Sequence, residues 1–369
     1  MFIFSKVDKL FLVITGLLLF AGFLIFSSAS MGLLARAGSN FTTVALKQIS
    51  VGFIGGGIVA IILSHIDFNF YKKYSFYIFI STLILTFAVF IPQIGFSHGG
   101  ATRWISLLGY SFQPAELLKL GFIIYLAAWL SKNKKNNNTF INGLIPVGII
   151  FTIVAFALLI QPDTDTLVVM LCAGTAMYFT AGASWKHILM IVLIGIVGLG
   201  VLIYTRPYIK DRFMTLLHPT ENSLGSGYQI EQSLIAIGSG GLWGRGFGQS
   251  VQKFNYLPEQ IGDSIFAVAA EEFGFIGSVT LLMLFLSFSL RGLYISSHAP
   301  DMFSRLLVLG IVILIITQSA VNISAMLAII PLSGIPLVFV SQGGTAMLIA
   351  LAEVGIILNV SKFKRKTIK

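Results

Sequence analysis

Residues 143–181 read GLIPVGIIFTIVAFALLIQPDTDTLVVMLCAGTAMYFTA. Two uncharged apolar stretches, 143–160 and 166–181, lie on either side of the short polar segment Gln161–Asp165. A helix that crosses a bilayer needs roughly 20 mostly apolar residues, and both stretches approach that length. Pro162 and two aspartates interrupt the hydrophobic pattern, and proline breaks the interior of a helix. The segment therefore predicts two membrane helices joined by a tight turn.

The same alternation of long apolar runs and short polar breaks extends over the whole chain. Of the 369 residues, 56% are hydrophobic and only 10% are charged, whereas soluble domains carry about a quarter charged residues. We expect an all-α polytopic membrane protein that forms one integral membrane domain over residues 1–369. We expect about ten transmembrane helices, at about 10–30, 48–65, 75–92, 114–130, 143–160, 166–181, 187–205, 264–290, 305–330 and 345–361.

The distribution of basic residues predicts the orientation, because lysine and arginine gather on the cytoplasmic side of short loops. With the N-terminus inside, the cytoplasmic segments hold most of them, while the short outer loops hold Arg36, Lys47 and Arg103. Both termini are then cytoplasmic, and residues 206–263 form a large extracellular loop between helices seven and eight. The net charge of +10 fits this bias, and we expect no nucleic-acid partner.

Most polar motifs lie next to the outer face in this topology. They are His98–Trp104, Gln161–Thr166, the long loop and Pro331–Gly344. The last of these interrupts an apolar stretch, and non-helical backbone at membrane depth must be covered by protein or water. We therefore expect a site that opens to the outer face. The five histidines lack the spacing of a zinc site, and we predict no metal cluster.

Asp263 is a candidate functional residue because it lies where the eighth apolar run begins. Ionisable groups near membrane depth are costly and often functional. Aspartate is also a favoured N-cap of helices, so a catalytic and a capping role both remain open.

Five other side chains are candidates for contacts with a substrate. Glu116 and Lys119 are three residues apart and share a helix face, so they either form an ion pair or line a polar cavity. Gln113 stands directly before the proline that opens their helix. Arg103 and Arg245 suit either a bound phosphate or lipid headgroups.

The order of the outer motifs resembles that of the SEDS family of peptidoglycan glycosyltransferases, the FtsW/RodA group. The resemblance extends over essentially the whole chain and favours the division-type branch. Asp165 stands where the family usually has glycine. The stretches that carry the resemblance are Ala101–Leu120, Gln161–Asp163, Tyr228–Gly248, Leu257–Gly277 and Pro331–Gly344.

The resemblance implies an enzyme of the bacterial cytoplasmic membrane that polymerises lipid II during cell division or elongation. Asp263 matches the family's essential aspartate, as a general base, and a divalent cation could assist the leaving group. The implied partners are a class B penicillin-binding protein and other divisome or elongasome membrane proteins. The implied substrate-binding residues are Arg103, Lys119, Glu116, Arg245 and Gln113.

Two other functions fit the composition, namely a lipid-linked precursor flippase or transporter and a membrane scaffold. A transporter needs polar residues at the midplane and access from both faces. The bias of the polar motifs to one face favours the enzyme.

Overall fold

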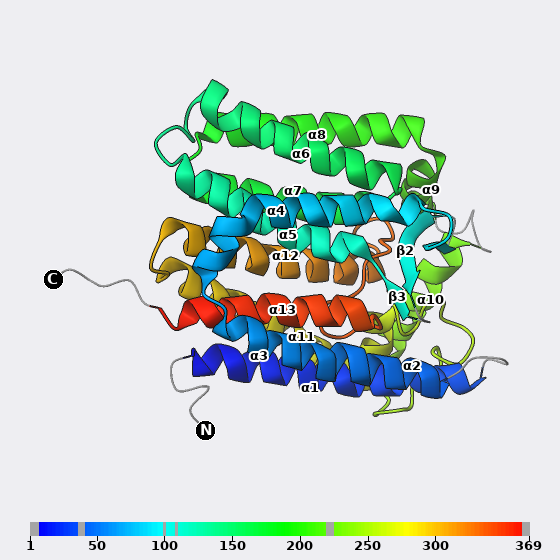
Figure 1. Cartoon of the computed structure of the whole chain (residues 1–369). Helices are drawn as coiled ribbons and strands as arrows, with labels where there is room; N and C mark the ends of the chain where they lie inside the picture. The colour runs from blue at the N-terminus through cyan, green and yellow to red at the C-terminus, as the bar shows by residue number, and fades with distance from the viewer. Residues whose placement is uncertain (1–6, 36–40, 99–100, 108–109, 219–224, 364–369) are drawn as a thin grey trace.

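The computed structural model describes residues 7–35, 41–98, 101–107, 110–218 and 225–363. Long helices run side by side in a bundle, with shorter helices and a small sheet at one end (Figure 1). The helices are α1 (Lys9–Met31), α2 (Phe41–Lys47), α3 (Gly56–His65), α4 (Phe68–Phe87), α5 (Pro114–Lys132), α6 (Ile145–Ile160), α7 (Thr164–Thr180), α8 (Trp185–Thr205), α9 (Pro207–Leu217), α10 (Ser226–Ser239), α11 (Ile265–Ser297), α12 (Met302–Met326) and α13 (Gly344–Ser361).

The predicted polytopic membrane fold is confirmed. Among the described residues, nine helical stretches are long and apolar enough to cross a bilayer. The tenth predicted run is the shorter apolar helix α7, whose 17 residues follow the Gln161–Asp165 turn as expected. The helices α2 and α3 act as one span because the π-helical turn Gln48–Gly55 joins them.

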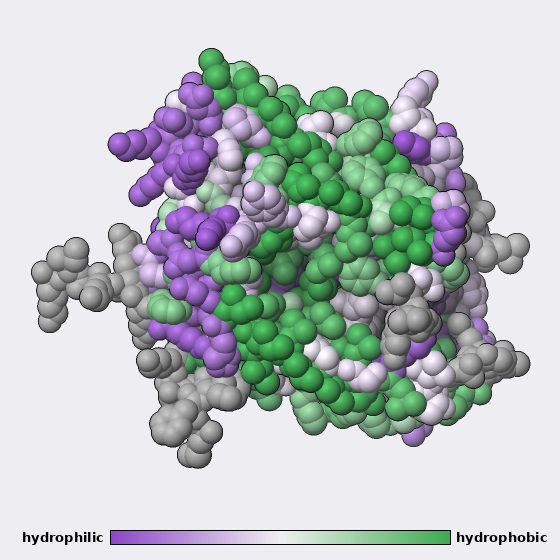
Figure 2. Space-filling view, in the orientation of Figure 1, coloured by the Kyte–Doolittle hydropathy of each residue, from purple (hydrophilic) through white to green (hydrophobic). Residues whose placement is uncertain are grey.

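The bundle has a buried centre and a lipid-facing rim. In α5 and α13, 72% of the most apolar stretch is buried inside the protein, against 6% in α8. Figure 2 shows a broad hydrophobic band between two hydrophilic ends, as a membrane protein requires. The described ends of the chain, Val7 and Phe363, lie at the same end of the bundle (Figure 1). The basic residues identify this end as the cytoplasmic one.

The outer end contains structure that the sequence did not predict. An antiparallel sheet of three strands, β1 (Gly95–His98), β2 (Ala101–Leu107) and β3 (Tyr110–Phe112), leads into α5. The predicted extracellular loop holds two helices, α9 and α10. The sheet adds to the expected all-α fold without changing its class, because its strands are short and lie outside the membrane helices.

The outer end also contains a long non-helical segment, residues 327–343, which we name the re-entrant segment. It follows α12 and precedes α13. Several of its side chains are buried, among them Leu337, Phe339 and Val340. Protein therefore covers this backbone, which confirms the expectation for Pro331–Gly344.

The topology can be tested with single cysteines in a Cys172→Ser background, because Cys172 is the protein's one cysteine. The exposed positions Tyr256 and Lys134 lie at opposite ends of the bundle. We expect an impermeant maleimide to label Tyr256→Cys but not Lys134→Cys in intact spheroplasts. The reverse pattern would overturn the orientation.

Candidate active site at the outer end of the bundle

Asp263 lies in the turn before α11 and is fixed through its backbone. The side-chain amide of Asn322, on α12, donates to the Asp263 carbonyl at 2.8 Å. The re-entrant segment holds the two preceding residues, because Ser341 Oγ donates to the Gly262 carbonyl at 2.8 Å and the Gln342 N–H donates to the Ile261 carbonyl at 2.7 Å. Two separate elements thus determine where Asp263 lies.

The structure separates the two interpretations of Asp263. The N-cap of α11 is Ser264, and the cap makes no side-chain hydrogen bond to the helix. The Ser264 hydroxyl instead accepts a hydrogen bond from the Gln229 amide at 2.9 Å. Capping therefore does not explain the aspartate, and a role for its carboxylate among the neighbouring charged groups is favoured.

The charged neighbours of the Asp263 carboxylate come from four parts of the chain. Burial raises the pKa of Asp263 to about 7, and the negative charges of Glu259 and Asp165 act in the same direction. The positive charges of Arg212 and Arg103 lower the pKa. A carboxyl with a pKa near 7 is suited to accept a proton at neutral pH.

Arg103 reaches this group of charges from strand β2. Its guanidinium donates to the carbonyls of Gln161, at 3.1 Å, and Pro162, and it lies 3.9 Å from the carboxylate of Asp163. The amide of Gln113 lies 3.4 Å from the same carboxylate. Gln113 thus supports the turn that holds Arg103, and its contact is with that turn.

Arg212 is the residue of this group of charges that sequence reasoning missed. It lies on α9 and pairs with Asp165 at 2.8 Å. Asp165, the departure from the usual family pattern, also accepts a hydrogen bond from the Gly334 N–H at 3.1 Å. Asp165 therefore joins α9 to the re-entrant segment. Its pairing with an arginine 47 residues away left no signal in the spacing of the sequence.

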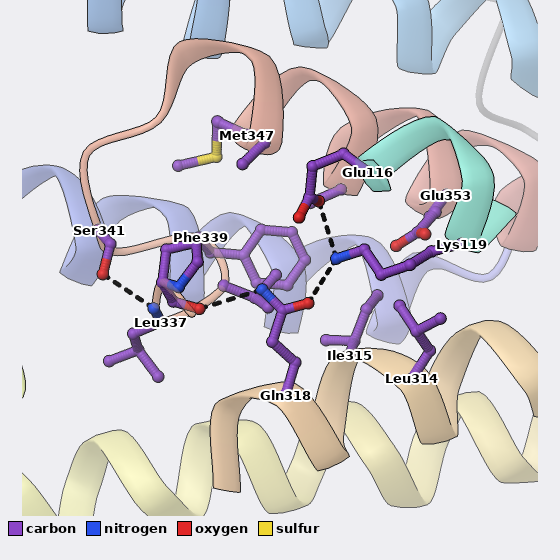
Figure 3. A pocket seen from close by; sticks show the side chains of 14 residues that line it. Glu116, Lys119, Leu314, Ile315, Gln318, Leu337, Phe339, Ser341, Met347 and Glu353 are labelled. Carbon is purple, nitrogen blue, oxygen red and sulfur yellow. Dashed lines mark hydrogen bonds and ion pairs between the residues drawn. The ribbon is translucent and has the colours of Figure 1, made fainter. Parts of the chain in front are cut away.

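Glu116 and Lys119 form the expected ion pair inside the bundle, with a distance of 2.8 Å. Lys119 also donates to the Gln318 side chain at 2.6 Å, and Gln318 donates to the Pro336 carbonyl at 3.1 Å. Figure 3 shows this chain of contacts beside Glu353. The cavity beside these residues measures about 20 Å³, which is room for about one water.

This interior cavity changes the interpretation of Glu116 and Lys119. The alternatives of ion pair and polar cavity both hold, but the cavity cannot admit a sugar. The contacts instead support the re-entrant segment from within the bundle. Binding of substrate by these two residues stays a prediction.

The structure places Arg245 away from this group of charges. The Arg245 guanidinium lies 3.4 Å from the Glu271 carboxylate. The backbone N–H of Arg245 donates to the backbone carbonyl of Glu271. Glu271 is six residues beyond Ile265, where α11 begins, or about 9 Å along the helix. The expected contact with a pyrophosphate bound at Asp263 therefore gains no support from this geometry.

Comparisons with known proteins agree with this architecture. The FtsW/RodA/SpoVE family, described as cell cycle proteins, matches residues 8–366. This chain belongs to that family. It is 38% identical to the stage V sporulation protein E of Bacillus subtilis, over 97% of this chain and 98% of the other. It is also 38% identical to a probable peptidoglycan glycosyltransferase FtsW of Geobacter sp. (strain M18), over 84% of each chain.

Solved structures share the fold of this family member. The rod shape determining protein RodA of Thermus thermophilus superposes with a TM-score of 0.71 and 25% identity, over 97% of each chain. A chain of a peptidoglycan synthase complex that coordinates polymerisation and crosslinking gives a TM-score of 0.74 at 24% identity, over 92% of this chain and 96% of the other. The family assignment makes this chain a multi-pass protein of the bacterial inner membrane.

Asn322 offers a test of how the site is assembled. Its amide donates to the carbonyls of Asp263 and Ile335, at 2.8 and 2.9 Å, and a buried carbonyl without a partner costs about 1–3 kcal/mol. We expect Asn322→Ala to lose roughly 2 to 4 kcal/mol of stability, measured as a lower Tm in detergent. An unchanged Tm would show that the two carbonyls have other partners.

Proposed function

We propose that this chain is a peptidoglycan glycosyltransferase that polymerises lipid II at the outer face of the cytoplasmic membrane. The observation that carries the proposal is the Asp263 carboxylate, with its raised pKa, near the guanidinium groups of Arg103 and Arg212. The curated relatives named as probable peptidoglycan glycosyltransferases support the same reaction.

In the proposed reaction, Asp263 accepts the proton of the acceptor sugar's 4-hydroxyl. The hydroxyl oxygen forms a bond to the anomeric carbon of the donor, and the bond from that carbon to the lipid pyrophosphate breaks. One displacement of this kind inverts the anomeric centre. A positioned base contributes about 10²–10⁴-fold to such a step.

The two arginines supply positive charge where the pyrophosphate leaves. Preorganised positive groups stabilise developing negative charge strongly because they need no reorganisation during the reaction. Each guanidinium is held by neighbouring groups, Arg103 by the Gln161–Asp163 turn and Arg212 by Asp165. These supports favour fixed positions for both charges before the substrate binds.

A class B penicillin-binding protein is the proposed partner, with other divisome or elongasome membrane proteins. The similarity in fold to a chain of a peptidoglycan synthase complex supports this partnership.

The described residues contain no group of three or more His, Cys, Asp or Glu placed to hold a metal ion. No step of the proposed reaction passes through a divalent cation.

The alternative function of flippase or transporter has less support. The polar cavity between α5, α12 and α13 holds about one water, whereas the charged groups around Asp263 gather at the outer end. This distribution suits chemistry at one face of the membrane.

Asp263→Asn tests the catalytic assignment. The amide keeps the size of the side chain but cannot accept the proton, so we expect polymerisation to fall by about 10²–10⁴-fold. The expected Tm is unchanged or higher, because the substitution removes a partly buried negative charge that has no ion pair. Labelled lipid II and product electrophoresis measure the activity.

Asp301→Asn is the matched control for this substitution. Asp301 is the N-cap of α12 at the cytoplasmic end, and asparagine caps a helix as well as aspartate does. We expect near-normal activity from the control. Near-normal polymerisation by Asp263→Asn itself would refute the assignment.

The pH dependence gives a second test of Asp263. A base must be deprotonated, so activity at low lipid II concentration should fall as the pH drops through about 7, the raised pKa of Asp263. In Asp165→Asn the midpoint of the curve of activity against pH should move to lower pH. The charge of Asp165 raises the pKa of Asp263, and Arg212 loses its ion-pair partner in this variant. A rate that is constant from pH 5 to pH 8 would contradict the role of Asp263.

A further inference from the structure

The fold alone does not explain why residue 334 is a glycine. Its φ lies outside the left-handed range that favours glycine. A Cβ built on it would meet no atom closer than 3.7 Å, which is ordinary contact. Gly274 is different, because its φ is 65° and a Cβ there would lie 2.2 Å from the Gly244 nitrogen.

The atoms around this missing Cβ are all charged groups of the candidate site. The nearest are Arg212 Nη2 at 3.7 Å, Asp263 Oδ2 at 3.9 Å and Arg103 Nη1 at 4.0 Å. Gly334 itself is exposed. The space over its Cα is therefore open and is bordered by one carboxylate and two guanidinium groups.

The backbone of Gly334 is fixed next to this space. Its N–H donates to Asp165, and the carbonyls of the next two residues accept hydrogen bonds from Asn322 and Gln318. The segment is thus held in place, and a side chain on Gly334 would point towards these charged groups.

We propose that the space over Gly334 is the seat of the reacting sugar oxygen, and that glycine is required there to keep it open. This inference rests on the proposed function and deepens it. The position that a Cβ would take lies 3.9 Å from Asp263 Oδ2 and 3.7 and 4.0 Å from the two guanidinium groups. An oxygen that packs against the bare Cα of Gly334 therefore lies close to all three groups. Gly334 acts as a positioning residue that determines how closely the substrate approaches the base.

Chemistry favours an oxygen of the sugar rather than an apolar group in this position. Both guanidinium groups already have polar partners. An apolar group would cover the Asp263 carboxylate without giving it one, which is costly. A hydroxyl donates to the carboxylate and accepts from a guanidinium at the same time.

Gly334→Ala tests the inference, because a methyl group fits the protein but occupies the proposed seat. We expect the Tm to stay the same or rise, since replacing glycine at a compatible φ reduces the entropy of the unfolded chain. We expect the kcat for lipid II polymerisation to fall by at least about tenfold, because displacing reacting groups by 1 Å costs up to about 100-fold. Equilibrium binding of lipid II in nanodiscs should weaken as well.

Gly238→Ala is the matched control. Gly238 lies on α10, is also exposed, and a Cβ there would meet no atom within 4 Å. We expect its activity, lipid II binding and Tm to remain close to those of the wild type.

The outcomes separate this inference from the proposed function. If the wild type and Gly238→Ala do not polymerise lipid II, the proposed function is wrong. The equilibrium binding of lipid II then still shows whether a side chain at Gly334 blocks the substrate. Wild-type binding and kcat in Gly334→Ala would overturn the inference. A clearly lower Tm would overturn it too, because glycine would then be required by the fold.

Discussion

The hydrogen bonds from Asn322 to two carbonyls hold together the two non-helical segments on which the candidate site depends. Backbone that leaves a helix near membrane depth needs polar partners, since lipid offers none. The Asn322 amide donates hydrogen bonds to the carbonyls of Asp263 and Ile335. Gln318, one turn earlier on α12, donates to the carbonyl of Pro336. The base and the glycine opposite it therefore take their positions from a single buried helix.

The second constraint is electrostatic. Arg212 pairs with Asp165, and Arg103 is held beside Asp163, so each arginine already has a carboxylate. Among the described residues, no basic nitrogen lies within 4.0 Å of the Asp263 carboxylate oxygens, so Asp263 forms no ion pair. Its charge is balanced only at longer range, while burial and two nearby acids raise its pKa. This arrangement fixes both guanidinium groups near Asp263 and leaves one carboxylate ready to accept a proton.

The sequence predicted those features that depend on local pattern. Apolar runs located the spans, Pro162 located the turn before α7, and the prolines and glycines of Pro331–Gly344 indicated non-helical backbone. Features that depend on contacts between distant residues were not predictable. Arg212 and Asp165 meet only in the folded chain, and the amide of Asn322 looks like any polar residue in a membrane helix. The sheet was missed because its strands are short and lie between two spans.

The most direct test of the account uses proteoliposomes that contain this chain, a class B penicillin-binding protein of the same organism and labelled lipid II. The account predicts polymerised glycan strands that a muramidase degrades, with formation dependent on this chain. Lipid II that moves between the leaflets without any polymer would contradict the account and favour the transporter instead.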